Sequence, residues 1–438
     1  MSAPAAGAAP RAMLSLDEAL LRLVAGSRPH ALDATESVST FEALGRVLAG
    51  DVRSALDVPP ADNTSMDGYA LRVADVPAAG AELVVGQRIP AGVVGRPLAP
   101  GQAARIFTGA QVPAGADAVV MQEQCEALAA PAGETGLGRV RVLAVPAPGQ
   151  WIRRRGEDVR AGAVVLARGA RLTPQALGLA ASVGAGRLTV LRRPRVAVFS
   201  TGDELVMPGE PLAPGAIYNS NRFTLRGLLQ AAGCVVEDFG IVPDRLEATR
   251  AALRGAAAHN DLIVTSGGVS VGEEDHLRPA VAAEGRIENW QIAMKPGKPL
   301  AFGAVRRGAG GGAGSGAGGG ERSGEALFVG LPGNPVSSFV TFLLCVNTVL
   351  RALQGLPTAL PRPLPLTAAF DWPRPDRRRE FARARLNEAG EVELFDNQSS
   401  GVLTSTVWAD GLVDIPAGGV VARGDRVRYL PLAELVAR

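Results

Sequence analysis

Cysteine and histidine are scarce in this chain of 438 residues, which holds three of each. The cysteines Cys125, Cys234 and Cys345 lie far apart and are odd in number. This pattern argues against a disulfide framework and a cysteine-based zinc site, and it favours a reducing compartment, which we expect to be the cytoplasm. None of the three histidines stands at a metal-ligand spacing, so no histidine metal site is indicated.

Long apolar runs and an excess of basic residues are missing as well. No apolar run reaches about 18 residues, so we expect no membrane span. The 45 Lys and Arg residues nearly balance the 43 Asp and Glu residues, and no basic stripe stands out, which argues against nucleic acid as a partner. Residues 1–12 are rich in Ala, Pro and Gly and lack a signal-peptide pattern, so we interpret them as a disordered tail.

The length exceeds what one hydrophobic core usually serves, so several domains are expected. Residues 13–50 and 160–194 predict one helical domain, with helices at 15–26, 40–49 and 173–184 and a capping box formed by Ser15 and Glu18. Short β-type runs broken by Pro and Gly predict a small β domain over residues 51–159. Residues 356–438 show β-type runs again and predict a small barrel.

Strands and helices alternate over residues 195–355. This series predicts a mostly parallel sheet with helices on both faces. A hairpin formed by residues 299–305 and 326–329 precedes a core helix over residues 335–353. The Gly-rich stretch 306–324 separates the two hairpin strands and is interpreted as a flexible, neutral insertion at the hairpin tip.

The segment DLIVTSGGVSVGEED at residues 261–275 is the most informative one. Its buried-strand pattern opens into Ser266, Gly267 and Gly268. Backbone N–H groups are then presented at the carboxyl edge of the sheet, where open α/β sheets bind ligands and where amide concavities suit anions. Three carboxylates follow and end with Asp275. They suggest a metal ion between a phosphate and the protein.

Two further loops have residues that suit anions. VGLPGNP at residues 329–335 places Asn334 at a helix N-cap and Pro335 at the first helical position, so free N–H groups face one point. MKPGKP at residues 294–299 holds Lys295 and Lys298 in a proline-locked turn, and a lysine point charge suits an oxyanion. An unliganded turn and a solvated lysine pair are the alternatives for these loops taken singly.

Carboxylates also follow the first strand of the α/β series. STGDEL at residues 200–205 brings Asp203 and Glu204 to the same sheet edge. With Asp275 they could hold Mg²⁺ or polarise a water, or they could cap the following segment.

Five other positions have side chains that suit a site but name no reaction. Asp67 in the β domain stands in a turn dipeptide, and Thr108 and Asp158 have the same status. Arg383 and Ser400, near the C-terminus, are of a type that holds oxyanions.

Eight motifs together resemble the molybdopterin molybdenumtransferase family, which includes the MoeA type and the E domain of gephyrin. They are PPADNTSMDGYA (59–70), IFTGAQVPAGADAVVMQE (106–123), RRRGEDV (153–159), STGDEL (200–205), YNSN (218–221), SGGVSVGEED (266–275), KPGKP (295–299) and GLPGNP (330–335). The resemblance covers the chain from about residue 13 to its end. It implies a multidomain α/β and β fold: a helical domain from two segments, an elongated β domain, a molybdopterin-binding three-layer α/β domain and a C-terminal β barrel.

The resemblance also implies a reaction, in which molybdate is inserted into adenylated molybdopterin with release of AMP and with the help of Mg²⁺. This is the final step of molybdenum cofactor synthesis. A homodimer and a partner that is a molybdopterin adenylyltransferase are implied too.

The implied catalytic residues are Asp67, Thr108, Asp203, Glu204 and Asp275, with Glu204 and Asp275 as metal ligands. The implied ligands of the molybdopterin phosphate and the adenylate are Asp158, Thr201, Gly202, Asp244, Ser266, Gly267, Gly268, Ser270, Pro332, Gly333, Asn334 and Pro335. The implied molybdate ligands are Lys295, Lys298, Pro299, Arg383 and Ser400.

Three other functions fit the sequence less well. An adenylyltransferase that makes the adenylate shares the α/β domain but needs none of the other domains. A receptor-clustering scaffold, as the gephyrin E domain also is, would not need the charged loops. A nicotinamide-binding function is not supported, because no Gly-x-Gly-x-x-Gly follows the first strand of the α/β series.

Overall fold

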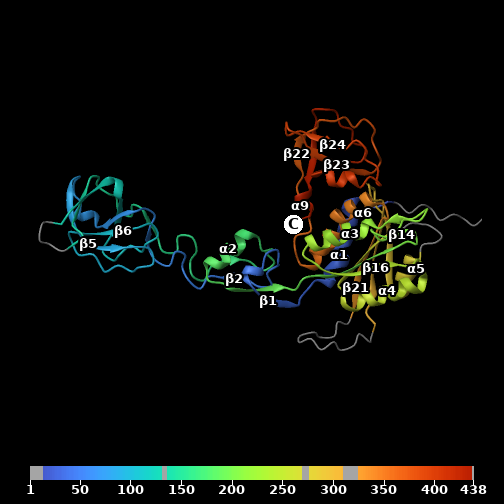
Figure 1. The fold of residues 1–438 in the computed structure, drawn as a ribbon, viewed down its shortest axis with the longest axis horizontal. Coiled ribbons are helices and arrows are strands. Elements are labelled where there is room, and N and C mark those ends of the chain that lie inside the picture. Colours follow the sequence, from blue (N-terminus) through green and yellow to red (C-terminus); the bar gives the residue numbers. More distant parts are fainter. Residues whose placement is uncertain (1–12, 131–135, 269–275, 309–323, 437–438) are drawn as a thin grey trace, which may run out of the picture. The chain divides into compact units, whose positions relative to one another are not determined.

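The computed structural model describes residues 13–130, 136–268, 276–308 and 324–436. The chain forms two compact units, of which the first combines residues 1–36 with 191–438 and the second holds residues 37–190. In Figure 1 the labels β5, β6 and α2 belong to the second unit, and α3, β21 and β23 belong to the first.

A six-stranded sheet forms the centre of the first unit, in the order β16-β13-β17-β21-β20-β18. The first four of these strands run parallel, whereas β20 is antiparallel to β21 and β18 is antiparallel to β20. The predicted mostly parallel sheet and its hairpin are therefore confirmed. The bounds are β13 Arg195–Thr201, β16 Val235–Val242, β17 Leu262–Ser266, β18 Gly285–Gln291, β20 Pro299–Arg306 and β21 Glu325–Leu331.

Helices cover both faces of this sheet, as the alternating pattern predicted. Val196 and Val198 of β13 point into a core with α3 (Ser220–Ala231) and the helix that starts at Pro335. Ala197 and Phe199 point into a second core with α4 (Leu246–His259) and α5 (Leu277–Glu284). Because successive strand residues face opposite sides, β13 is apolar throughout and buried on both faces.

The helix over Pro335–Leu353 consists of α6 (Pro335–Thr341), a π-helical turn (Phe342–Val346) and α7 (Asn347–Leu353). By length and composition it could cross a membrane, but 89% of its apolar window is buried inside the fold. It therefore serves as the predicted core helix of the α/β domain.

Helix α1 (Leu16–Ser27) begins with the predicted capping box. The Ser15 hydroxyl accepts from the N–H of Glu18 at 3.2 Å, and the Ser15 N–H donates to the Glu18 carboxylate at 2.8 Å. The sequence placed α1 in a helical domain with residues 160–194. In the structure its buried face, with Leu16 and Leu23, packs with α7 in the core of the first unit. A short 3-10 turn, Arg28–His30, follows α1.

The C-terminal domain is a small closed sheet, as predicted. Its strands follow the order β23-β25-β26-β22, and β24 pairs with the side of β23 that faces away from β25. Ala368, just after β22, bridges Val392 of β24, which joins the two edges. The edge strand β19 (Met294–Lys295) adds to β23 in parallel and so connects this domain to the α/β domain. The bounds are β22 Leu364–Thr367, β23 Arg379–Leu386, β24 Val392–Leu394, β25 Gly411–Ile415, β26 Arg426–Pro431, α8 Thr404–Trp408 and α9 Leu432–Val436.

The second unit contains the predicted β domain, built on a sheet in the order β7-β4-β6-β5-β9-β8. The edge strands β7 and β8 are separated only by the 3-10 turn Gln122–Gln124, so one bent segment of the chain provides both edge strands of the sheet. The bounds are β4 Gly68–Leu71, β5 Ala81–Ile89, β6 Gln102–Ile106, β7 Ala118–Met121, β8 Cys125–Leu128 and β9 Arg139–Val142.

A smaller core in the second unit is made by two chain segments, which contribute Leu48 from the first, and Leu172 and Val190 from the second. The helix predicted at residues 40–49 is wrong, because only the 3-10 turn Thr40–Glu42 forms. Gly45 then takes a φ of +73°, a conformation that ends a right-handed helix. The remaining elements are α2 Pro174–Ser182, Val73–Asp75 (3-10) and the strand pairs Thr35–Ser39 with Arg187–Leu191, Val52–Arg53 with Val164–Leu166, and Asn63–Thr64 with Ile152–Arg153.

Candidate active site

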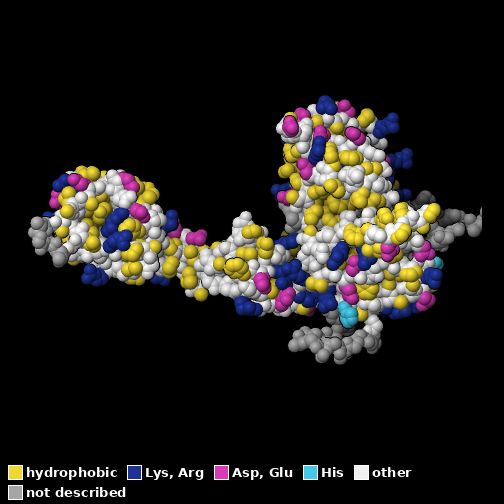
Figure 2. Space-filling view, viewed as in Figure 1, with side chains coloured by type: hydrophobic (Ala, Val, Ile, Leu, Met, Phe, Trp, Pro, Cys, Tyr) yellow, Lys and Arg dark blue, Asp and Glu magenta, His cyan; other side chains and the backbone are white. Residues whose placement is uncertain are grey.

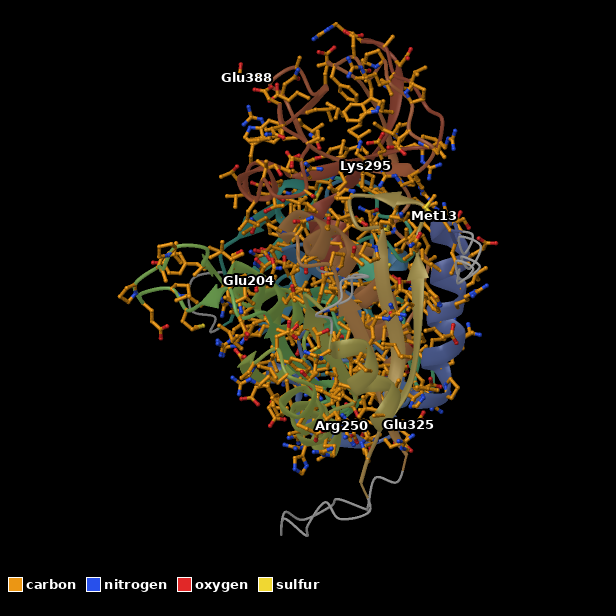
Figure 3. The ribbon with its side chains drawn as sticks, turned by 90° about the vertical axis from the view of Figure 1, so that its right-hand side faces the viewer. Met13, Glu204, Arg250, Lys295, Glu325 and Glu388 are labelled. Atoms are coloured by element: carbon orange, nitrogen blue, oxygen red, sulfur yellow. The ribbon has the colours of Figure 1, made fainter. Side chains whose placement is uncertain are left out.

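A cavity of about 1130 Å³ opens at the carboxyl end of the parallel strands in the first unit. The ends of β13, β17 and β21, the starts of α3 and α6, the loop after β19 and the barrel segment 398–403 border it. In Figure 3, Lys295 lies next to the barrel, whereas Glu204 lies away from the barrel, beside a segment that projects from the sheet. The predicted site residues that line the cavity are Thr201, Gly202, Glu204, Asp244, Ser266, Gly267, Gly268, Lys295, Lys298, Pro299, Pro332, Gly333, Asn334, Pro335 and Ser400.

Two glycines let the loop after β17 pass very close to β13. Gly267 and Gly268 have φ angles of +91° and +65°, which glycine adopts without strain. A Cβ on Gly267 would stand 2.9 Å from the backbone oxygen of Thr201, and one on Gly268 would stand 2.9 Å from the Thr201 hydroxyl. The N–H of Gly267 donates to the carbonyl of Leu331 at 3.2 Å. This loop is therefore held between two strand ends, with its polar groups at the cavity wall.

Asn221 connects this loop to the loop after β21. Its side-chain nitrogen donates to the Ser266 hydroxyl and to the Gly333 carbonyl, each at 2.7 Å. Asn219 caps α3 by accepting from the N–H of Arg222 at 3.2 Å. Both residues belong to the YNSN motif, but no role was predicted for them from the sequence. The signal was available, because an Asn directly before a helical pattern is a capping residue.

The start of α6 differs in detail from the prediction. Asn334 occupies the N-cap position, but its side chain makes no capping hydrogen bond. The N–H of Val336 donates to the carbonyl of Ser400 at 3.0 Å, so a barrel residue satisfies one of the helix N–H groups. The helix start and the barrel segment therefore form a continuous wall of the cavity.

Lys295 and Lys298 are the only two lysines among the chain's 45 basic residues. The ammonium of Lys295 lies 2.9 Å from the carboxylate of Glu380, which is buried, and 3.8 Å from Asp376. The pairing follows from the sheet register, which sets Lys295 opposite Glu380 in β23. Lys298 is exposed, and no carboxylate in the described part of the chain forms an ion pair with it. Lys298 is therefore better placed than Lys295 to give its full charge to an anion.

Arg378 brings a third cation to the wall, and it was not among the site residues predicted from the sequence. Its guanidinium holds both carboxylate oxygens of Asp376, at 3.0 and 2.9 Å. These hydrogen bonds lower the pKa of Asp376 far below its usual range, so this pair stays charged at neutral pH. The sequence gives little indication that Arg378 belongs to the site, because three arginines follow one another from Arg377 and the pattern does not show which of them faces the cavity.

Arg383 does not line the cavity. It is 1% exposed, and it donates to the Ser405 hydroxyl at 3.1 Å and to the Ser399 carbonyl at 3.2 Å. Burial lowers the pKa of Arg383 to about 10, which leaves it protonated at neutral pH. In the structure it holds the segment that carries Ser400.

Carboxylates gather on the side of the cavity where β13 ends. Glu204 and Asp244 line the cavity, and Asp203 accepts a hydrogen bond from the N–H of Asp244 at 3.2 Å. Gly202 has a φ of +141°, and a Cβ there would stand 2.5 Å from the Glu204 carboxylate, so glycine lets this carboxylate lie back over the loop. No cluster of three His, Cys, Asp or Glu side chains suited to a metal occurs in the described residues. Asp275 and Ser270 lie outside the described residues.

Three predicted residues belong to the second unit. The Asp67 carboxylate accepts from both the N–H and the hydroxyl of Thr108, each at 2.8 Å, and these bonds lower the pKa of Asp67. The N–H of Asp158 donates to the carbonyl of Val58 at 3.0 Å. The structure thus brings Asp67 and Thr108 together, and it places Asp158 on a separate loop.

Family models match three parts of the chain: the MoeA N-terminal region (domain I and II) at residues 14–184, a probable molybdopterin binding domain at 197–352 and the MoeA C-terminal region (domain IV) at 365–432. The molybdopterin molybdenumtransferase of Haemophilus influenzae is 38% identical, over 97% of this chain and 100% of that protein. Molybdopterin molybdenumtransferase 2 of Mycobacterium tuberculosis is 39% identical, over 90% of this chain and 95% of that protein.

Solved structures agree with this result. A crystal structure of the molybdopterin biosynthesis MoeA protein from Pyrococcus horikoshii OT3 matches with a TM-score of 0.78 at 28% sequence identity, covering 96% of this chain and 100% of that one. The whole-length relatives, the three family models and the shared multidomain fold show that this chain belongs to the molybdopterin molybdenumtransferase (MoeA) family.

Proposed function

We propose that this chain inserts molybdate into adenylated molybdopterin and releases AMP, as the last step of molybdenum cofactor synthesis. The observation that carries this proposal is one cavity that combines both lysines with two glycine-rich strand ends and a carboxylate group. An elongated substrate with a diphosphate needs such a series of groups, and the oxyanion needs cations beside it. The family membership supports the same reaction.

The chain's own residues have separable tasks in this mechanism. The loops at Ser266 and Gly333, tied by Asn221, position the diphosphate of the substrate. Lys298 and Lys295, with Ser400 nearby in the cavity wall, attract molybdate to the dithiolene end. Holding the two reactants in one geometry removes much of the entropic cost of their encounter. Water then cleaves the P–O bond of the phosphoanhydride, so that one phosphate stays on the pterin product and the other leaves with adenosine as AMP.

The carboxylates fit Mg²⁺, which binds proteins through one or two carboxylates plus substrate phosphates. Glu204 and Asp244 supply two such groups on one wall. We propose Glu204 as a ligand, together with Asp275 as implied by the resemblance. When bound, the ion would neutralise charge that develops on the phosphates.

The test of this function is AMP release from adenylated molybdopterin, with Mg²⁺ and with or without molybdate. We expect release that depends on molybdate, with molybdenum retained on the pterin. Formation of the adenylate from ATP would instead favour the adenylyltransferase function. Binding without any AMP release by the purified chain would contradict the proposed reaction.

The Gly-rich insertion is expected to be dispensable for this reaction. It connects the ends of β20 and β21 at the Arg306–Glu325 pair, whereas Pro299 at the other end of the hairpin lines the cavity. The eight residues of β20, with a rise of about 3.3 Å per residue, separate the two ends. Deleting residues 308–320 should therefore change kcat/KM for AMP release by less than a few-fold. A collapse of turnover with an unchanged thermal unfolding temperature would contradict this expectation.

We further propose that the chain works as a homodimer in the cytoplasm and receives its substrate from a molybdopterin adenylyltransferase. Three free cysteines, two of them buried, accord with a reducing compartment. Sedimentation of the purified chain at several concentrations tests the dimer, and a monomer at all of them would exclude it.

A further inference from the structure

The segment between β14 (Leu205–Val206) and β15 (Ile217–Tyr218) exposes apolar side chains at one wall of the cavity. Leu205, Ile217 and Tyr218 line the cavity, and Ile217 and Tyr218 are 55% and 44% exposed. Figure 2 shows hydrophobic side chains gathered where Figure 1 labels β14, and Figure 3 shows the segment projecting beyond Glu204. The cavity lining elsewhere is mostly polar, glycine or proline, and Tyr218 is the aromatic side chain among the described lining residues.

Hydrogen bonds hold this wall in place. The Tyr218 hydroxyl donates to the carbonyl of Glu210 at 3.0 Å, which fixes the direction of its ring. The N–H of Ile217 donates to the carbonyl of Glu204 at 2.8 Å, and the N–H of Asn219 donates to the carbonyl of Val206 at 3.0 Å. A partly exposed aromatic ring that is held at a cavity wall is a platform on which a flat heterocycle can stack.

The order of groups in the substrate indicates which ring would stack there, and this step rests on the proposed function. Molybdate joins the dithiolene beside the pterin, the diphosphate follows, and the adenosine forms the other end. Lys295 lies next to the barrel, in a different part of the cavity from Glu204 (Figure 3), and Lys298 follows it three residues later in the same cavity-lining loop. With the dithiolene near the lysines and the diphosphate at the strand ends between, the adenosine reaches the wall of Tyr218.

We infer that Tyr218, with Leu205 and Ile217, forms a subsite that binds the adenine ring of the adenylated substrate and of the AMP product. Its apolar surface accepts one face of the ring, and the hydroxyl bond to Glu210 keeps the tyrosine oriented. Contact with the adenine ring then adds to the affinity that the phosphates provide by binding at the neighbouring strand ends.

Calorimetric titration of the full chain with AMP, and with ribose 5-phosphate, which lacks the ring, tests this subsite without turnover. We expect the wild type to prefer AMP, and Tyr218→Ala and Tyr218→Leu to lose about tenfold in AMP affinity with no change for ribose 5-phosphate. Tyr218→Phe should keep most of the affinity, because it keeps the ring. Phe223→Ala is the matched control, because Phe223 is 54% exposed on α3 but does not line the cavity.

The outcomes separate the subsite from its rivals. Unchanged AMP affinity in both Tyr218→Ala and Tyr218→Leu, with unfolding temperatures near that of the wild type, would overturn the inference, as would a wild type that does not distinguish AMP from ribose 5-phosphate. Weakened binding of 6-hydroxymethylpterin with unchanged AMP binding would overturn the assignment to adenine and favour the pterin. A change only in sedimentation would mean that a second copy covers this wall, and it would overturn the subsite too. Ring-dependent AMP binding without AMP release from the substrate would count against the proposed reaction alone.

Discussion

Replacing Lys298 with alanine is expected to raise the KM for molybdate in AMP release by about 10- to 100-fold, which corresponds to the loss of one hydrogen bond to a charged group. The effect should be larger than that of Lys295→Ala. Lys295 already shares its charge with the buried Glu380 at 2.9 Å, whereas Lys298 has no carboxylate partner among the described residues. Initial rates at varied molybdate concentration measure both variants.

The sequence offers a sharp control for this prediction. Every other basic residue of the chain is arginine, so Lys298→Arg tests whether charge alone suffices. We expect the arginine variant to stay at least about fivefold above the wild-type KM, because a planar guanidinium cannot replace a compact ammonium in a tight turn.

Reductive methylation with ¹³C-formaldehyde labels only two lysine side chains, so molybdate binding at each is visible by NMR. Equal molybdate response of both signals, or full activity of Lys298→Ala, would contradict the assignment.

Gly267→Ala is expected to lower kcat/KM by about 100-fold, the size of effect that a displacement of about 1 Å at a reacting site produces. The left-handed backbone at φ +91° costs alanine about 1–2 kcal/mol. The new Cβ would also stand 2.9 Å from the Thr201 backbone oxygen, which cannot rotate away. The loop that positions the phosphates must therefore move.

Gly390→Ala is a control that separates the displacement of the Gly267 loop from the backbone strain of an alanine at positive φ. Gly390 has a φ of +75°, but a Cβ there meets nothing within 4 Å, and it lies outside the cavity lining. We expect Gly390→Ala to lose similar stability while keeping its activity. If both variants lose activity to the same extent, the close approach at Thr201 does not control the site.

Several features followed from the sequence because they depend on neighbouring residues. Local patterns predicted the capping box at Ser15, the apolar strand from Arg195 and the glycine-rich loops that follow the strands. Because the strands are parallel neighbours in one sheet, the loops after them meet at one edge of that sheet. That is why the loops at Ser266, Lys295 and Gly333 could be assigned to one site before their positions were known.

Other features depend on contacts between distant residues, and only the tertiary structure decided them. Helix α1 joins the α/β core because its apolar stripe meets α7, and Arg383 lies behind the cavity wall because β23 turns it inward toward Ser405. The difference between Lys295 and Lys298 arises from the pairing of β19 with β23, which sets one lysine against Glu380. A sequence shows which side chains a loop carries, but the charge left for a ligand depends on which partners the fold places beside them.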